Sequence, residues 1–342
     1  MKTHVTDVEA ARAYQASTLP SFVYLSTSQR QLVRAKAKQW IAWRRAHPRL
    51  HNAVGIGLLA FLFAFDAYVL LELPRQLPLD LATRSGIVFA ALTTGFIHGF
   101  LVCSIVTYSV HEGAAHDLIV VGNGPVVRVL RVLANNACRL FLADPDYYAA
   151  SHFKHHRWLG TEEDGSFTNH VRLRRLLLAI VPMAPVFSHS DYFPWRPQEH
   201  TRSRKISAVL TKLHLAVFFS AMTWRFGVLY AVISLLVIGT WISFVFDRLR
   251  ESTEHLGMPL ERIHGTRDFG LGLWGLLLGG GPWGQPCHFS HHLEPALPWY
   301  HQLALHFFLR RILTPRQKRQ FFLRPVVGFP ALLVRLARGR AR

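Results

Sequence analysis

Long apolar runs separated by polar and basic segments dominate the chain. Residues 53–73 and 86–109 each form one run, and as a helix each is long enough to cross a bilayer. A third apolar stretch at 206–246 is too long for one span, and Arg225 and Gly227 divide it. We therefore predict two helical hairpins, whose four transmembrane helices cover about 53–73, 86–109, 206–224 and 226–246.

This pattern predicts an all-α membrane protein. Half of the 342 residues are hydrophobic and only 17% are charged, which is more apolar than a typical soluble domain of this length. Residues 53–310 form the expected membrane domain, with basic flanks at 1–52 and 311–342. The first 50 residues lack an apolar core, so we expect no cleavable signal peptide.

The distribution of positive charge predicts the orientation in the membrane. The net charge is +19, and 35 of the 39 Lys and Arg residues fall outside the spans on the side that carries both termini. The positive-inside rule therefore places both termini and the middle segment in the cytoplasm, as expected for a multi-pass protein of a bacterial inner membrane. Orientation explains the charge better than DNA does, so no nucleic-acid partner is expected.

Three short histidine clusters follow the predicted spans: HEGAAH at 111–116, HFKHH at 152–156 and HFSHH at 288–292. With 20 histidines in the chain, one HxxHH string would arise by chance only about 0.07 times, and this chain has two. Imidazole binds first-row metals such as iron without adding charge. Because all three clusters fall on the predicted cytoplasmic side, we expect a helical cap that holds them in one metal-binding layer.

The spacing within the clusters predicts how their side chains are presented. The histidines of 152–156 have i, i+3, i+4 spacing and therefore share one helical face. His111 and His116 are five residues apart, which separates them by about 140° on a regular helix. Either these two histidines face different metals, or Gly113 helps to deform the turn.

Most other histidines are expected to be structural or interfacial. His98 and His214 lie inside predicted spans, where a hydrogen bond between helices is the favoured interpretation. His301 and His306 follow the last cluster closely and could orient its ligands, but a position on the exposed face of a helix is the favoured interpretation. The same structural interpretation applies to the isolated histidines His4, His47, His51, His170, His189, His200 and His264.

Taken together, these motifs resemble the integral-membrane fatty acid desaturase and hydroxylase superfamily. That family has three histidine boxes, HX3–4H, HX2–3HH and HX2HH, with the first two after one hairpin and the third after another. HHLEPALPWYH at 291–301 resembles a continuation seen in many lipid-acting members. RESTEH at 250–255 resembles a further family segment whose histidine is also a ligand. The resemblance covers roughly residues 50–310.

The resemblance implies a di-iron site with nine imidazole ligands: His111, His116, His152, His155, His156, His255, His288, His291 and His292. The chain departs from the acyl-CoA desaturases at Glu251, where that branch has an Asn that holds one iron through water. Glu251 could be a ligand, a hydrogen-bond acceptor beside the ligands, or a salt-bridge partner of Arg248 or Arg250. We favour the last two.

Carboxylates near the boxes could accept the second N–H of metal-bound histidines. Glu254 adjoins His255 in RESTEH and is the preferred acceptor. The acids close to the boxes in sequence are Glu112, Asp117, Asp144, Asp146, Asp164, Glu254 and Glu294.

By resemblance, the two irons use O2 as cosubstrate to abstract hydrogen from a lipid chain drawn from the bilayer. The first hypothesis is a fatty acyl desaturase. Within the same fold, the alternatives are a carotenoid ketolase or hydroxylase, or a terminal hydroxylase or alkene-forming enzyme on fatty chains. From a different class, a histidine-rich metal transporter should place ionisable residues near mid-membrane, whereas Asp66, His98 and His214 are isolated there.

The chemistry also needs electrons from another protein. The sequence contains no flavin-binding motif, no haem-binding module and no CxxC pair. We therefore expect a separate electron donor of the ferredoxin, rubredoxin or cytochrome type, attracted to the basic face.

Overall fold

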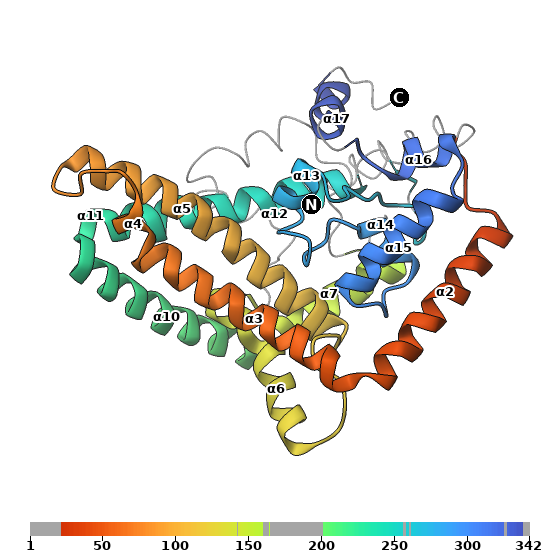
Figure 1. Ribbon diagram of the computed structural model, residues 1–342, viewed down its shortest axis with the longest axis horizontal. Helices are drawn as coiled ribbons and strands as arrows, with labels where there is room; N and C mark the ends of the chain where they lie inside the picture. Colours follow the sequence, from red (N-terminus) through yellow and green to blue (C-terminus); the bar gives the residue numbers. More distant parts are fainter. Residues whose placement is uncertain are drawn as a thin grey trace. The chain divides into compact units, whose positions relative to one another are not determined.

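A computed structural model describes residues 22–141, 143–159, 164, 201–255, 258–259, 261–324 and 327–337 of the chain. These residues are helical apart from loops and one isolated bridge between Asp268 and Phe322 (Figure 1). The chain divides into two compact units. Unit 1 combines 1–48, 150–180 and 248–342, and unit 2 combines 49–149 and 181–247.

Unit 2 contains the long apolar helices. Four of them are long and apolar enough to cross a membrane, which confirms the four predicted spans. They are α3 (Pro48–Leu71); α5 (Arg84–Thr107), which continues into the π-helix η2 (Tyr108–Ala115); α10 (Arg202–Phe226); and a fourth made of α11 (Val228–Ala231), the π-helix η4 (Val232–Gly239) and the first part of α12 (Thr240–His255).

A one-residue turn separates the last two spans, as the sequence predicts. Gly227 lies between α10 and α11 with φ +88°, a conformation that favours glycine over other residues. The neighbouring Arg225 donates a 2.6 Å hydrogen bond to Glu72, just before the short helix α4 (Leu73–Gln76). This pair ties the two inter-helix connections of unit 2 to each other.

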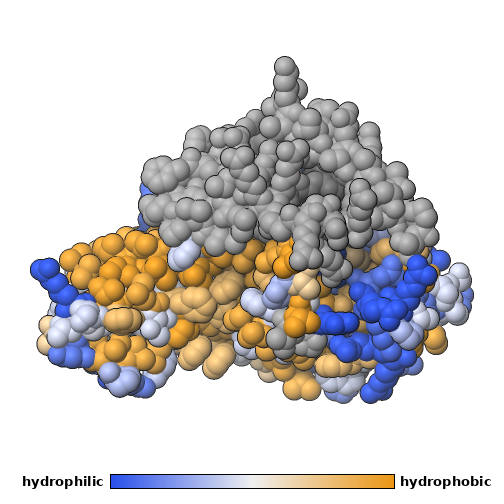
Figure 2. All heavy atoms as spheres, turned by 90° about the horizontal axis from the view of Figure 1, so that it is seen from above, coloured by the Kyte–Doolittle hydropathy of each residue, from blue (hydrophilic) through white to orange (hydrophobic). Residues whose placement is uncertain are grey.

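Small residues let the helices of unit 2 approach closely. A Cβ on Gly99 would lie 2.6 Å from the carbonyl oxygen of Gly239, so α5 and η4 touch backbone to backbone. His98 on α5 contacts Asp66 on α3 through Nδ1 at 2.7 Å, which is the predicted hydrogen bond between helices. Outside this interior, the unit presents a broad apolar surface, orange at the left of Figure 2.

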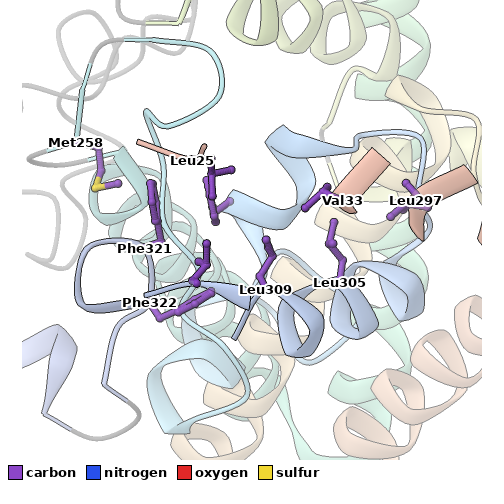
Figure 3. Packing of buried hydrophobic residues seen from close by; sticks show 11 residues of the cluster. Leu25, Val33, Met258, Leu297, Leu305, Leu309, Phe321 and Phe322 are labelled. Atoms are coloured by element: carbon purple, nitrogen blue, oxygen red, sulfur yellow. The ribbon is translucent and has the colours of Figure 1, made fainter. Parts of the chain in front are cut away.

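Unit 1 is organised around a hydrophobic core, shown in Figure 3. The basic helix α2 (Thr27–Ala46) begins at a Ser26–Gln29 capping box and buries Val33 and Ala37. Leu305 and Leu309 of α15 (Trp299–Ile312) join the same core. Phe321 and Phe322 of the C-terminal flank lie in it as well, so the described parts of both predicted basic flanks contribute to the core of unit 1.

The remaining helices of the described residues are short. Unit 1 also contains α13 (Leu273–Leu278), α14 (His288–Leu293), α16 (Pro315–Phe321) and α17 (Gly328–Ala337). Unit 2 also contains α6 (Pro125–Asn136) and the 3₁₀-helix η3 (Ala137–Phe141), and α7 (Pro145–Trp158) begins in unit 2 and ends in unit 1.

Candidate metal centre

The second and third histidine clusters lie on two helices of unit 1. The last turns of α7 carry His152, His155 and His156, all buried, and α14 carries the buried histidines of 288–292. Phe289 lies within the third cluster and stacks on Phe321 at a ring distance of 4.1 Å. This stacking fixes α14 to the core of unit 1.

Four histidines of unit 1 form one buried cluster. His155, His255, His288 and His292 each place one ring nitrogen within 4.8 Å of the others, and all four are buried. The Nε2 atom of His288 lies 3.2 Å from Nε2 of His255 and 3.1 Å from Nε2 of His292. The ends of α7 and α12 and the short helix α14 thus bring together residues from three segments that are distant in the sequence.

In two of these rings the outer nitrogen, which is the Nδ1 atom that points away from the cluster, faces a backbone carbonyl. His255 Nδ1 lies 2.9 Å from the carbonyl oxygen of Gly265, and His292 Nδ1 lies 3.1 Å from that of Arg262. A carbonyl can only accept, so both Nδ1 atoms carry the proton and donate it. The Nε2 atoms of these two rings, which face the cluster, are therefore unprotonated, and each presents a lone pair.

His155 has the same arrangement with a carboxylate. Its Nδ1 lies 3.0 Å from Oδ1 of Asp164, which is itself fully buried. Carboxylates and carbonyls on the outer nitrogen are the usual partners of metal-bound histidines, and they fix the orientation of each ring.

Burial keeps two rings of the cluster, His255 and His292, uncharged. Desolvation, together with repulsion from His155, lowers the pKa of His255 to about 3. The same burial, together with repulsion from the neighbouring histidines, lowers the pKa of His292 well below its ordinary value. Neutral rings with converging lone pairs repel one another, and a cation bound between them would satisfy them all. The donor set therefore fits a metal ion.

A second group of three histidines lies beside the first in unit 1. Nε2 of His156 is 2.9 Å from Nε2 of His152 and 2.8 Å from Nε2 of His291. The side-chain amide of Gln302, on α15, lies 3.1 Å from Nδ1 of His291 and also donates to the carbonyl of Leu297. The two groups together hold seven of the nine predicted ligands.

The first cluster lies in unit 2, on η2. The rings of His111 and His116 are 5.0 Å apart, and the backbone N–H of His116 bonds to the carbonyl of His111 at 3.2 Å. This i→i+5 pattern is that of a π-helix, in which residues five apart come round to the same side. The turn is therefore deformed, which was one of the two alternatives left open by the spacing.

Gly113 fits this turn because it has no side chain. A Cβ there would lie 3.0 Å from Oδ1 of Asn135 and 3.1 Å from the side chain of Ile119. The glycine therefore allows η2 to pack closely against α6. Glu112, also buried, places Oε1 3.3 Å from Nδ1 of His111.

Glu254 approaches the third cluster from the end of α12. Its Oε2 lies 3.6 Å from Nε2 of His288, which is the nitrogen that faces the cluster. Its role as an acceptor beside the ligands stays a prediction. Glu251 belongs to α12, but its side chain lies outside the described residues.

Asp268 supports the third cluster and was missed in the sequence. Its carboxylate accepts hydrogen bonds from the backbone N–H and the hydroxyl of Ser290 at 3.1 and 2.8 Å, and from Nδ1 of His306 at 2.7 Å. Ser290 lies between two predicted ligands of α14. Asp268 is 20 residues before the cluster, and its only sequence signal is a single acid directly before an apolar stretch.

Two histidines on α15 differ from their predicted surface positions. His306 is buried and bonded to Asp268, and His301 is buried against Trp40 at a ring distance of 5.6 Å. Their interpretation as helix-face surface residues was wrong, because α15 packs against other helices on that face. Cys287 lies close to Asp268 and His306, and burial raises the pKa of its thiol well above the ordinary value.

The remaining acids near the boxes have structural partners or contacts. Asp117 lies 3.3 Å from Nε of Arg131, and Asp146 lies 3.0 Å from the guanidinium of Arg139. The Ser203 hydroxyl binds Asp144 at 2.6 Å. Glu294 is half-buried, which raises the pKa of its carboxyl.

Comparison with known proteins bears on this arrangement. The model of the fatty acid desaturase family matches residues 85–324, which include all three histidine clusters, the end of α12 and Asp268. No curated protein and no solved structure matches the chain.

Proposed function

Because the chain belongs to the fatty acid desaturase family, we propose that it is an O2-dependent di-iron oxidase that introduces a double bond into a fatty acyl chain. Family membership makes it a fatty-acid-modifying oxidoreductase of the desaturase or hydroxylase type. Desaturation, the use of two irons and O2 are the proposal.

The observation that carries the proposal is the convergence of inner nitrogens in unit 1. His255 and His292 are held with their outer N–H groups on carbonyls, so their lone pairs meet those of His155 and His288. Iron is the metal that the family implies for such an all-nitrogen site. Two irons bound by this chain would supply the reduction of O2 and the removal of hydrogen from an unactivated C–H bond.

We propose the ligand set in two parts. His155, His255, His288 and His292 would hold one iron. His152, His156 and His291 would be ligands of the second iron, and His111 and His116 are the remaining imidazoles that the family resemblance implies. Supporting this, the π-helix brings the rings of His111 and His116 within 5.0 Å of each other.

The carboxylates near the histidines would have two different roles. Asp164 and Glu112 face histidine Nδ1 atoms, so their negative charge would make the ligand rings more basic and offset the charge of the irons. Glu254 faces the inner side at His288 Nε2, where a carboxylate could bind metal or accept a proton during turnover. Glu251, in the preceding turn of α12, is proposed as a further acceptor near the site.

The membrane supplies the substrate in this proposal. Four apolar helices and the family make the chain a membrane protein. We propose that it lies in a bacterial inner membrane, with both termini and the metal site facing the cytoplasm, because the basic residues gather on that side. The lipid chain would then enter from the bilayer.

Electrons would come from a separate ferredoxin, rubredoxin or cytochrome. The described surface of α2 exposes Arg34, Lys38 and Arg45, and such a basic helix suits an acidic protein partner. Mixing of the purified chain with each class of donor, followed by the rate of product formation, identifies the donor that works.

Metal analysis and lipid profiling test the function together. We expect about two iron ions per purified chain and new double bonds in the lipids of a host that expresses it. The His292→Ala variant, expressed to the same level, should give neither the full iron content nor the product. Detection of hydroxylated chains, terminal alkenes or ketocarotenoids instead would show that the chain catalyses another reaction of the same fold and not desaturation. One zinc ion, or no bound metal, would overturn the di-iron proposal.

A further inference from the structure

The helix α6 of unit 2 has an apolar face that its own fold leaves uncovered. Val126, Val129, Val132 and Leu133 are each at least 60% exposed. On a helix of 3.6 residues per turn these four positions fall in one continuous arc. Exposed apolar patches of this kind mark contact with a protein or with lipid.

The opposite face of α6 is firmly attached to η2. Ser109 of η2 donates a 2.7 Å hydrogen bond to the carbonyl of Ala134, and its hydroxyl accepts one from the N–H of Cys138 at 3.1 Å. Asn135 lies against Gly113, as described above. The outward direction of the apolar arc is therefore set by the same contacts that position the first histidine cluster.

The direction of α6 relative to the spans favours lipid. In Figure 1, α6 runs across the direction of α3 and α10 and leaves the bundle near the ends where α5 passes into η2. A helix in this position, at the end of a span, lies along the surface of the bilayer rather than through it. Its apolar arc is then continuous with the lipid-facing surface of the spans.

The polar residues of α6 agree with this placement. Arg128 is exposed at the margin of the apolar arc, where a long basic side chain can reach lipid phosphates. Arg131, on the inner side, is bound to the carbonyls of Val120 and Gly122 at 3.1 and 2.6 Å. One arginine is thus used to hold the preceding loop and the other is presented to the surroundings.

We infer that α6 is an interfacial helix whose Val126, Val129, Val132 and Leu133 are buried among the lipids of the leaflet next to the first histidine cluster. This inference is independent of the reaction that the protein catalyses. Because α6 packs against η2, contact of α6 with lipid would also help to hold η2 in place.

Spin labels on single introduced cysteines test the inference in the full chain, reconstituted in nanodiscs of phosphatidylcholine and phosphatidylglycerol. The reference positions are Phe61→Cys, exposed on the span α3, and Asn123→Cys, exposed in the loop before α6. Native Cys103, Cys138 and Cys287 are buried, and the unaltered protein measures their background labelling.

We expect labels in Val129→Cys and Leu133→Cys to resemble the Phe61 reference. Their accessibility to oxygen should exceed that to a water-soluble nickel complex several-fold, whereas Arg128→Cys should give a lower ratio. A ratio at Val129 and Leu133 equal to that at Asn123 would show that the face is in water. Low accessibility to both reagents would show that protein covers the face. Either result would overturn the inference.

Discussion

The first and third histidine clusters contain similar side chains, but different contacts hold them in place. In unit 1, the third cluster is held by polar contacts, because Asp268 binds Ser290 and carbonyls bind the outer nitrogens. In unit 2, the first cluster depends on close packing of backbone and glycine around a π-helix, to which Ser109 adds hydrogen bonds with Ala134 and Cys138. A buried site can thus be positioned by specific hydrogen bonds or by the absence of side-chain atoms. The two means should fail differently.

The largest effect is expected from His288→Ala, which removes the ring at the centre of the four-histidine cluster. Its Nε2 contacts two other ligands and faces Glu254, so the variant should lose more than about 100-fold in turnover and part of its iron. Product formation and iron per chain measure this. His47→Ala, at an exposed histidine, is the control and should retain both. Full iron retention in His288→Ala would contradict the ligand assignment.

The polar support of the third cluster is tested by Asp268→Asn. An amide cannot accept all three hydrogen bonds from Ser290 and His306, so we expect iron affinity to fall by about 10–100-fold and unfolding to become easier by about 1–3 kcal/mol. Competition with a chelator and thermal unfolding measure the two effects. Asp80→Asn, at an exposed acid in unit 2, should change neither. An unaltered affinity would show that the core alone positions α14.

The close packing near the first cluster is tested by Gly55→Ala. A Cβ on Gly55 would lie 2.3 Å from the carbonyl oxygen of Ile119, in the segment that follows His116, so backbone must move. We expect a loss of about 1–3 kcal/mol, measured as a lower unfolding temperature. Gly57→Ala, two residues along the same helix, meets nothing within 4 Å and should be neutral or slightly stabilising. Equal stability of the two variants would show that the backbones separate without cost.

The smallest effect is expected from lowering the pH, which should reduce the stability of the metal-free protein. The pKa of His255 falls from 6.5 in the unfolded chain to about 3 in the folded one, and that of His116 falls to about 4, in each case through burial. The unfolded state binds protons first, so stability of the metal-free protein is complete above about pH 6.5 and is lost as pH falls towards those values. Thermal unfolding from pH 7 to 5 should show this. Over this range both histidines stay neutral in the folded protein, so His255→Gln and His116→Gln should each flatten the dependence by a similar amount. A profile as steep as that of the unaltered protein in either variant would contradict the assignment.

Local patterns were sufficient for the spans and for part of the site. Apolar run length predicts the four long helices, and the i, i+3, i+4 spacing of 152–156 predicts a shared face on α7. Both depend only on residues that are neighbours in the sequence. The break at Gly227 was visible for the same reason.

Features that depend on tertiary packing were not visible. Gly113 and the spacing left a deformed turn at His111 as one of two alternatives, but they could not decide it, because the register of the π-helix is set by contacts with α6 and with the segment around Ile119. Asp268 meets the third cluster only after the chain has folded back, and the burial of His306 depends on the helices that pack against α15. The side of His288 that Glu254 approaches depends equally on the direction in which α12 ends.

The hydrogen bonds from the outer histidine nitrogens have a consequence for biosynthesis. His255 and His292 are oriented by carbonyls of the chain itself, so these rings take their positions as the polypeptide folds. In the proposed di-iron enzyme, iron would then bind to rings that are already oriented, in a separate step that follows folding.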